Sequence, residues 1–361
     1  MDLSCDIPAR KAFLELVRCG AMGSAPDPAL FRGLTAGDWE TIYTLARRQT
    51  VCGLCYTAYC VLPDSLLPTG PVLPRWVARV EAIEDAGRRM ACAVRELVDA
   101  FRRAGLHPVV QKGLSVARFY PAPGLRECGD IDLWFPESEM PAAVALAAAK
   151  GRTVTTHPDG SRSFSFRGFV VELHRRLISI SAPRASRRLA AAVARMCVDS
   201  VPAADLPSPP PLLELLLIDV HIMRHAFGTG IGLRQICDYM LAADRLRGRY
   251  DRTEFARMCA ALGISRWTAL LNAFTVRYLG ADAASLPPSG CEKEVTLPVE
   301  DLMRIVLEGG NFGHHSASGA PRRRGKSHTV AMLVRRSRFA FSVAPAESFW
   351  NIVRLTFGQF K

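Results

Sequence analysis

The spacing of apolar residues in this 361-residue chain changes in one short central stretch. Before residue 104 and after about residue 186, apolar residues recur every three or four positions, which is the period of amphipathic helices. Between residues 108 and 174, short apolar runs alternate with turns, as is typical of strands. One small group of strands set between helical regions predicts an α+β fold with a small mixed sheet.

The central stretch is predicted to contain one helix among its strands. An alanine-rich segment at 137–150 begins after Pro136 and ends at Gly151, which are typical helix boundaries. The segment VVELH at 170–174 is an apolar strand that contains an acidic residue and ends in histidine. The predicted strands are 108–111, 131–135, 152–156, 161–166 and 169–174.

Two links that contain proline suggest how the chain divides. LPDSLLPTGPVLP precedes a long amphipathic helix predicted at 75–104, and VPAADLPSPPP follows a helix predicted at about 186–198. A chain of this length typically forms two or three domains. We therefore expect a helical N-terminal segment at 1–84, a core that carries the sheet at 85–200 and a helical C-terminal domain at 201–361.

Two aspartates on one predicted strand form the first candidate site. Residues two apart on a strand point to the same face, so Asp130 and Asp132 should project together. Two carboxylates at such a separation repel each other and favour a cation or a shared proton between them. Glu172 is a third carboxylate in an apolar strand, where a charge is otherwise costly. If its strand lies beside that of Asp130, the three acids form a site for two Mg²⁺ or Mn²⁺ ions.

A second group of residues precedes the aspartates. Lys112, Gly113 and Ser115 lie where a strand is expected to turn into a helix, so that backbone N–H groups and a hydroxyl can face a phosphate. Arg126 and Gly129 follow a Pro-Gly turn just before Asp130. A guanidinium at this place is suited to phosphate oxygens near a bound metal.

The ordered set KGLS at 112–115, RECGDID at 126–132 and VVELH at 170–174 resembles the uncharacterised nucleotidyltransferase family of the DNA polymerase beta-like superfamily. GIGLRQICDY at 230–239 and LEGGNFG at 307–313 extend the resemblance over most of residues 90–315. The resemblance implies a small nucleotidyltransferase core that uses a nucleoside triphosphate. It also implies metal binding by Asp130, Asp132 and Glu172, and nucleotide binding by Lys112, Gly113, Ser115, Arg126 and Gly129.

One position departs from the superfamily pattern. Leu114 separates Gly113 from Ser115, so the adjacent Gly-Ser pair of the superfamily is absent here.

Four further residues are candidates for the cleft or for support of the acids. His174 shares a strand face with Glu172, and it orients that acid, titrates near the metals or forms an ordinary polar contact. His225 lies four residues after His221, but Ile222 occupies the place of the glutamate of an H-E-x-x-H zinc motif, so packing or a nucleotide contact is expected. Arg234 and Asp238 have the spacing of an intrahelical ion pair, and a place in the cleft is the competing interpretation.

Charge and composition indicate which partners and which cellular compartment to expect. The formal net charge of +12 attracts anions, including nucleotides and RNA, and a basic loop at 314–327 adds to it. The apolar stretch at 211–223 is interrupted by Glu214, Asp219 and His221 and is too short to span a membrane. Eleven cysteines without an even framework and a first segment without a secretory pattern favour the cytoplasm.

The expected activity is metal-dependent nucleotidyl transfer. A nucleoside monophosphate would move from a triphosphate to a hydroxyl of a small molecule, a sugar or a protein, with release of pyrophosphate. One alternative is transfer to RNA, as in toxins of the superfamily that modify transfer RNA, although aromatic RNA-binding motifs are absent from the sequence. The other is a catalytically silent nucleotide-binding protein.

Overall fold

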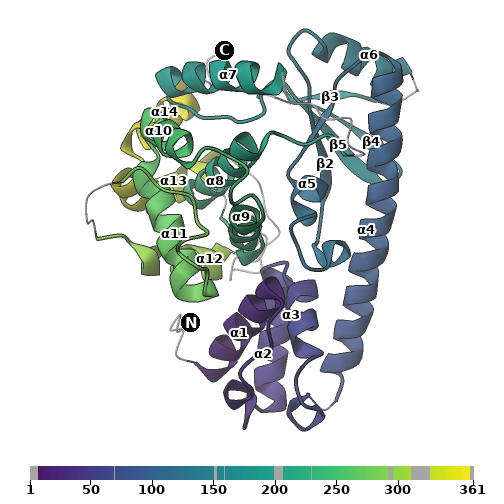
Figure 1. The fold of residues 1–361 in the computed structure, drawn as a ribbon, viewed down its shortest axis with the longest axis vertical. Helices are drawn as coiled ribbons and strands as arrows, with labels where there is room; N and C mark the ends of the chain where they lie inside the picture. The colour runs from purple at the N-terminus through teal and green to yellow at the C-terminus, as the bar shows by residue number, and fades with distance from the viewer. Residues whose placement is uncertain are drawn as a thin grey trace.

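The computed structural model describes residues 7–68, 70–149, 153–157, 159–198, 206–228, 230–291, 296–309 and 326–357. The α+β prediction is confirmed, since one five-stranded mixed sheet lies among many helices (Figure 1). The strands are β1 (Val109–Gln111), β2 (Asp130–Trp134), β3 (Thr155–Thr156), β4 (Arg162–Phe166) and β5 (Phe169–His174). The helices are α1 (Pro8–Met22), η1 (Pro28–Phe31), α2 (Ala36–Arg48), α3 (Cys52–Tyr59), η2 (Asp64–Leu66), α4 (Val72–Arg103), α5 (Gly113–Ala117), η3 (Pro123–Leu125), α6 (Met140–Ala149), α7 (Pro183–Val198), α8 (Pro211–Phe227), α9 (Leu233–Arg245), α10 (Arg252–Leu262), α11 (Ser265–Leu279), α12 (Val299–Gly309), α13 (Lys326–Val343) and α14 (Pro345–Phe357).

The sheet has the strand order β1-β2-β5-β4-β3. Only the central pair, β2 and β5, is parallel, while β1 and β4 run antiparallel to their neighbours. The chain leaves β2 through α6 and the β3–β4 hairpin before it returns as β5 beside β2. A crossover of this length is what a parallel pair requires, because a tight hairpin joins only antiparallel strands.

The two faces of the sheet differ in chemistry. Alternate residues of β2 and β5, including Ile131, Leu133, Val171 and Leu173, are almost completely buried in one hydrophobic cluster with the second half of α4 and with α6. The opposite face carries the acidic residues. Because side chains alternate along a strand, this apolar packing forces the charged residues to the other side of the sheet.

Helix α4 is the longest element and runs along one edge of the molecule, from the N-terminal helices to the sheet (Figure 1). It begins at Val72, three residues before the predicted start, because Pro74 is tolerated in a first turn whose N–H groups have no helical partner. It passes through Gly87, where an added Cβ would lie 3.2 Å from the carbonyl oxygen of Gly124. Because α4 runs from Val72 to Arg103, the boundary predicted between residues 84 and 85 falls inside this helix. The boundary predicted between residues 200 and 201 lies outside the described residues.

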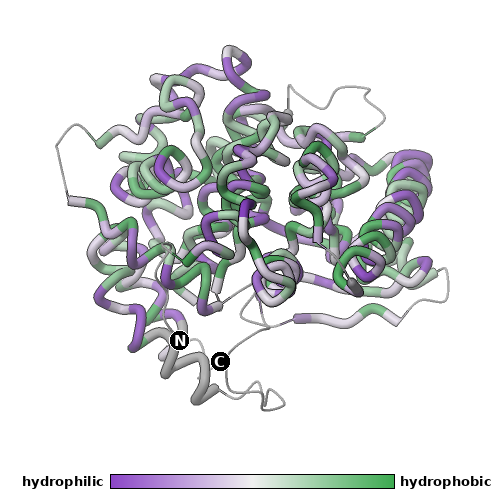
Figure 2. The backbone as a smooth tube through the Cα atoms, turned by 90° about the horizontal axis from the view of Figure 1, so that it is seen from below, coloured by the Kyte–Doolittle hydropathy of each residue, from purple (hydrophilic) through white to green (hydrophobic). Residues whose placement is uncertain are grey.

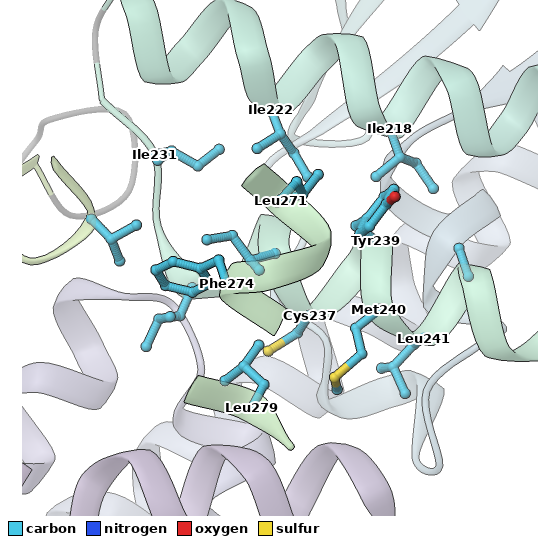
Figure 3. Packing of buried hydrophobic residues seen from close by; sticks show 14 of the residues in the cluster. Ile218, Ile222, Ile231, Cys237, Tyr239, Met240, Leu241, Leu271, Phe274 and Leu279 are labelled. Carbon is cyan, nitrogen blue, oxygen red and sulfur yellow. The ribbon is translucent and has the colours of Figure 1, made fainter. Parts of the chain in front are cut away.

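The N-terminal helices and the C-terminal helices share a second hydrophobic cluster. The buried Gln49 links the N-terminal helices to the C-terminal helices. Its side chain donates to the carbonyl oxygen of Val306 at 2.9 Å and accepts from the backbone N–H of Leu233 at 2.8 Å. Figure 3 shows the part of this cluster between α8, α9 and α11, where Ile222 and Phe274 point inward. In Figure 2, apolar and polar residues alternate along most helices, as expected for helices that bury one side.

None of the helices in the described ranges combines the length and the apolar character needed to cross a lipid bilayer.

Gly53 on α3 is a point of very close packing. A Cβ at this position would lie 2.3 Å from the carbonyl oxygen of Leu125 in η3, just before the segment that leads to β2. We expect Gly53→Ala to lower the free energy of unfolding by about 1–3 kcal/mol, because the backbone of η3 has to move. Thermal and urea unfolding would measure the loss.

Gly37 on α2 is the matched control, because a Cβ there meets only the Thr35 hydroxyl, at 3.6 Å. Gly37→Ala should leave stability unchanged or raise it slightly, since alanine is the better helix former. Equal effects of the two substitutions would show that the contact between α3 and η3 is not tight.

Candidate active site

The acids predicted from the sequence lie together on the polar face of the sheet. In the parallel pairing of β2 and β5, Asp132 lies directly opposite Glu172, and Asp130 lies opposite Val170. Asp130, Asp132 and Glu172 therefore project from the same side. Asp130 is exposed and the Glu172 side chain keeps 33% of its accessible surface, so the group is open to a ligand, whereas Asp132 is buried beneath them.

Asp132 is the most strongly held of the three acids. Its Oδ1 atom accepts from Lys112 Nζ at 3.2 Å and from His174 Nε2 at 2.6 Å. The same His174 nitrogen lies 3.4 Å from Glu172 Oε2. An ionised carboxylate only accepts hydrogen bonds, so Nε2 carries the proton in this arrangement. His174 therefore connects the acids of the two strands.

The charges on the two aspartates respond differently to this environment. Asp130 keeps an exposed surface, but the surrounding protein removes part of the water around its carboxylate. This desolvation, together with the negative charge of Asp132, raises the pKa of Asp130 to about 6. Burial would also raise the pKa of Asp132, but Lys112 and His174 outweigh it and lower that pKa to about 2. The site therefore holds more negative charge than its own cations balance, which favours a bound cation.

The residues present fit a divalent metal ion. Donor atoms of Asp132, Glu172 and His174 all lie within 4.8 Å of one another. Gln111 of β1 lies directly opposite Asp132 in the sheet, and its buried Oε1 atom has no hydrogen-bond partner in the part of the chain that is described. Directly opposite residues share a face, so an oxygen acceptor stands beside the acids. His174, expected only as a supporting residue, belongs to this donor set.

Lys112 reaches Asp132 from an unusual backbone conformation. Its φ of 54° and ψ of −147° lie in a region that non-glycine residues rarely adopt, and Gly113 follows with a φ of 33°. The turn lets β1 end and α5 begin within two residues. Such conformations cost about 1–3 kcal/mol and persist only where surrounding contacts enforce them. Gly129 directly precedes Asp130, and a Cβ added to it would meet no atom within 4 Å.

Ser115 and Arg126 are placed differently from what the phosphate-binding prediction implies. Ser115 is fully buried, and its hydroxyl donates to the carboxylate of Glu214 on α8. The Arg126 guanidinium is buried in a two-pronged ion pair with Asp238 on α9, both contacts at 2.7 Å. Tyr120 also donates to Asp238, at 2.6 Å. Both predicted phosphate contacts thus bind the C-terminal helices in this structure, and their role towards phosphate stays a prediction.

Arg234 and Asp238 both reach from α9 to the core. Arg234 is buried and donates to the backbone carbonyl of Glu127, two residues before Gly129. Asp238 binds Arg126 and Tyr120. These bonds join α9 to the segment that precedes β2. A place of the two residues in the cleft stays a prediction.

The histidines of α8 pack against each other. The rings of His221 and His225 meet edge to face, with centroids 4.4 Å apart. Burial, followed by the positive charges of Lys112 and Arg224, lowers the pKa of His225 to about 3. Burial also lowers the pKa of His221 well below its ordinary value. Both rings are therefore neutral at physiological pH, and the expected packing is found.

Sequence reasoning missed the residues that hold the site from the helical domain. Buried Glu214 forms an ion pair with the partly exposed Arg118 next to Ser115, and Tyr120 supports Asp238. The one available signal was a charged residue in the apolar run at 211–223, the same signal that identified Glu172. The predicted basic loop lies outside the described residues up to residue 325.

A pair of carboxylates on one strand, a third on its parallel neighbour and a lysine at the adjoining turn form the arrangement expected of a nucleotidyl-transferring protein. A family model described as uncharacterised nucleotidyltransferase matches residues 35–280, more than half of the chain, and the chain belongs to this family. Its general activity is therefore nucleotidyl transfer. Comparisons with curated proteins and with solved structures give no match.

Removing charge from each aspartate should have opposite effects on the stability of the metal-free protein. The pKa of Asp130 is raised from 3.8 to about 6, so its ionisation destabilises the fold above about pH 6 but not below about pH 4. Asp130→Asn should therefore raise the Tm at neutral pH, with a gain that disappears towards pH 4. Thermal unfolding in the presence of a chelator would measure this.

Asp132→Asn should lower the Tm under the same conditions. The lowered pKa of Asp132 means that its stabilisation is present above about pH 4 and is lost as the pH falls towards 2. The substitution replaces the charged acceptor of Lys112 and His174 by a neutral amide oxygen. Both hydrogen bonds are weakened, and we expect a loss of about 1–3 kcal/mol. If both variants shifted the Tm in the same direction at neutral pH, the electrostatic description of the pair would be wrong.

The buried ion pair of Arg126 and Asp238 gives a further prediction. Asp238→Asn leaves a buried guanidinium without a counter-charge, and we expect a loss of about 3–5 kcal/mol in the free energy of unfolding. The double variant Arg126→Met, Asp238→Leu removes both charges and should lose less than the single variant, as measured by urea unfolding. A double variant at least as unstable as the single one would contradict this.

Proposed function

We propose that this protein transfers a nucleoside monophosphate from a nucleoside triphosphate to a hydroxyl group and releases pyrophosphate, with the aid of divalent metal ions. The observation that carries the proposal is the register of β2 and β5, which sets Glu172 opposite Asp132 on the face that also bears Asp130. Family membership supports the class of reaction.

Asp130, Asp132 and Glu172 are the proposed metal ligands. Two divalent ions, when bound, would neutralise the triphosphate and stabilise the attacking and leaving oxygens. His174 lies close enough to the acids to join them once its Nε2 atom has released its proton. A nitrogen donor suits Mn²⁺ better than Mg²⁺, which strongly prefers oxygen. We therefore expect Mn²⁺ to bind at least as well as Mg²⁺.

Lys112 is the proposed contact to the triphosphate. Its ammonium group already bonds Asp132, and its side chain is partly exposed, so it stands between the acids and solvent. A bound triphosphate would bring negative oxygens to this place and share the ammonium with the aspartate. Gly113 leaves the turn free of a side chain, which allows close approach.

In the proposed reaction, the acceptor oxygen forms a bond to the α phosphorus in line with the bond that breaks to the β phosphate. The pyrophosphate leaves with the electrons of that bond, and the hydroxyl proton passes to a carboxylate. Glu172 is the acid proposed to accept it, because it is partly exposed and lies at the edge of the group.

The acceptor is proposed to be a small molecule, a sugar or a protein side chain. Transfer to RNA is the alternative that the net charge of +12 permits. Incubation of the protein with each labelled triphosphate, Mn²⁺ or Mg²⁺ and cell extract would show which fraction becomes labelled. Label in RNA would replace the proposed acceptor class, and no label with any metal would favour a silent binding protein.

Metal-dependent binding is the direct test of the proposed site. Calorimetric titration with Mg²⁺ or Mn²⁺ and each of ATP, GTP, CTP and UTP should show binding of at least one nucleotide. The double variant Asp130→Asn, Asp132→Asn should abolish it, because both metal ions lose carboxylate ligands.

Asp85→Asn with Glu96→Gln is a control of equal charge change, since both residues lie on the exposed side of α4 in surface ion pairs. This control should bind as the wild type does. Undiminished binding by the aspartate double variant would refute the metal role of the pair.

A further inference from the structure

We propose that Glu214 of α8 is a positioning residue of the nucleotide site, which holds the Lys112–Gly113 turn in the conformation that directs the lysine at Asp132. This inference rests on the proposed function. It assigns to the C-terminal helical domain a part in the geometry of the site, although Glu214 itself touches neither the acids nor the proposed position of the triphosphate.

Glu214 joins α8 to α5 through two side chains. Its Oε1 accepts from the hydroxyl of Ser115, and its Oε2 accepts from the guanidinium of Arg118. Arg118 closes the group by donating to the Ser115 hydroxyl oxygen at 2.8 Å and to the Ser115 carbonyl oxygen at 2.6 Å. These hydrogen bonds join α8 to α5 at Ser115 and at Arg118, the residue that follows α5.

The burial of this group argues that its geometry matters. Glu214 is 1% exposed and Ser115 is completely buried. A buried carboxylate adds little net stability compared with an apolar residue of the same size, because removing its charge from water is costly. What such a group does provide is one defined arrangement, since hydrogen bonds are directional and apolar contacts are not.

The turn needs an external support. Lys112 holds a φ of 54°, and α5 has only five residues, too few to be stable without tertiary contacts. The N–H of Val116 donates to the carbonyl oxygen of Lys112 at 3.2 Å, so the turn and the first turn of α5 form one unit. Ser115 is the polar side chain of that unit, and fixing it to Glu214 fixes the direction in which Lys112 leaves the backbone.

A second buried carboxylate on the same helix allows a matched comparison. Asp219 is also completely buried, but it accepts from Trp267 Nε1 at 2.7 Å and from the Thr268 hydroxyl at 2.6 Å, both on α11. It therefore supports the helical domain and not α5. Asp219→Asn controls for the loss of a buried carboxylate from α8.

The experiment compares Glu214→Gln and Asp219→Asn at temperatures where both are folded. Amide hydrogen exchange of the ligand-free proteins reports the turn directly: exchange over residues 112–118 should speed up in Glu214→Gln and stay as in the wild type in Asp219→Asn. Calorimetry with Mn²⁺ and the nucleotide that the wild type binds should show a Kd raised about 10-fold or more in Glu214→Gln, the range found for residues that orient ligands. In Asp219→Asn the Kd should be unchanged.

If Glu214→Gln does not fold, Ser115→Ala provides the same test from the other side, because it leaves the ion pair of Glu214 and Arg118 in place. Unchanged exchange over residues 112–118, or equal changes of Kd in the two carboxylate variants, would overturn the proposal for Glu214. A wild type that binds no nucleotide would instead overturn the proposed function, so the two failures are distinguishable.

Discussion

The parallel pairing of β2 with β5 is the contact on which the site depends. It is fixed from the apolar side of the sheet, where Ile131, Leu133, Val171 and Leu173 are buried against α4 and α6. Burial of each such side chain contributes roughly 1.5–3 kcal/mol. A shift of one residue would exchange these side chains with the acids and place carboxylates in the core. The same packing that stabilises the sheet therefore gathers the acids on the opposite face.

Two carboxylates of the C-terminal helices contact the segment between Lys112 and Asp130. The segment from Lys112 to Asp130 contains only short helices, and long irregular segments are mobile unless they are fastened. Glu214 fastens its first turn, and Asp238 fastens its end by binding Arg126. Both carboxylates come from helices that are themselves buried in the large hydrophobic cluster. The lysine and the aspartates are thus held relative to each other by two charged contacts.

Local sequence patterns were sufficient to predict the two central strands and the acids that they carry. Alternation revealed β2 and β5, the two-residue spacing of Asp130 and Asp132 gave their common face, and a charge in an apolar strand identified Glu172. The contacts of Ser115 with Glu214 and of Arg126 with Asp238 join residues 99 and 112 positions apart. No periodicity encodes such a pairing. A serine and an arginine beside a phosphate-binding motif are read as phosphate ligands, since the sequence does not show the carboxylates that engage them.

Leu114 gives a physical reason for the position of Ser115. Successive residues of a helix point about 100° apart. Leu114 packs against the cluster beneath the sheet, and Ser115, the next residue, is turned towards α8. In the Gly-Ser pattern of the superfamily that the sequence resembles, the hydroxyl would follow the glycine directly. Here the Ser115 hydroxyl lies in the interface with α8, where it donates to Glu214. In the proposed site, phosphate contacts at this turn accordingly fall to Lys112 and the backbone at Gly113, while the serine determines how the turn is held.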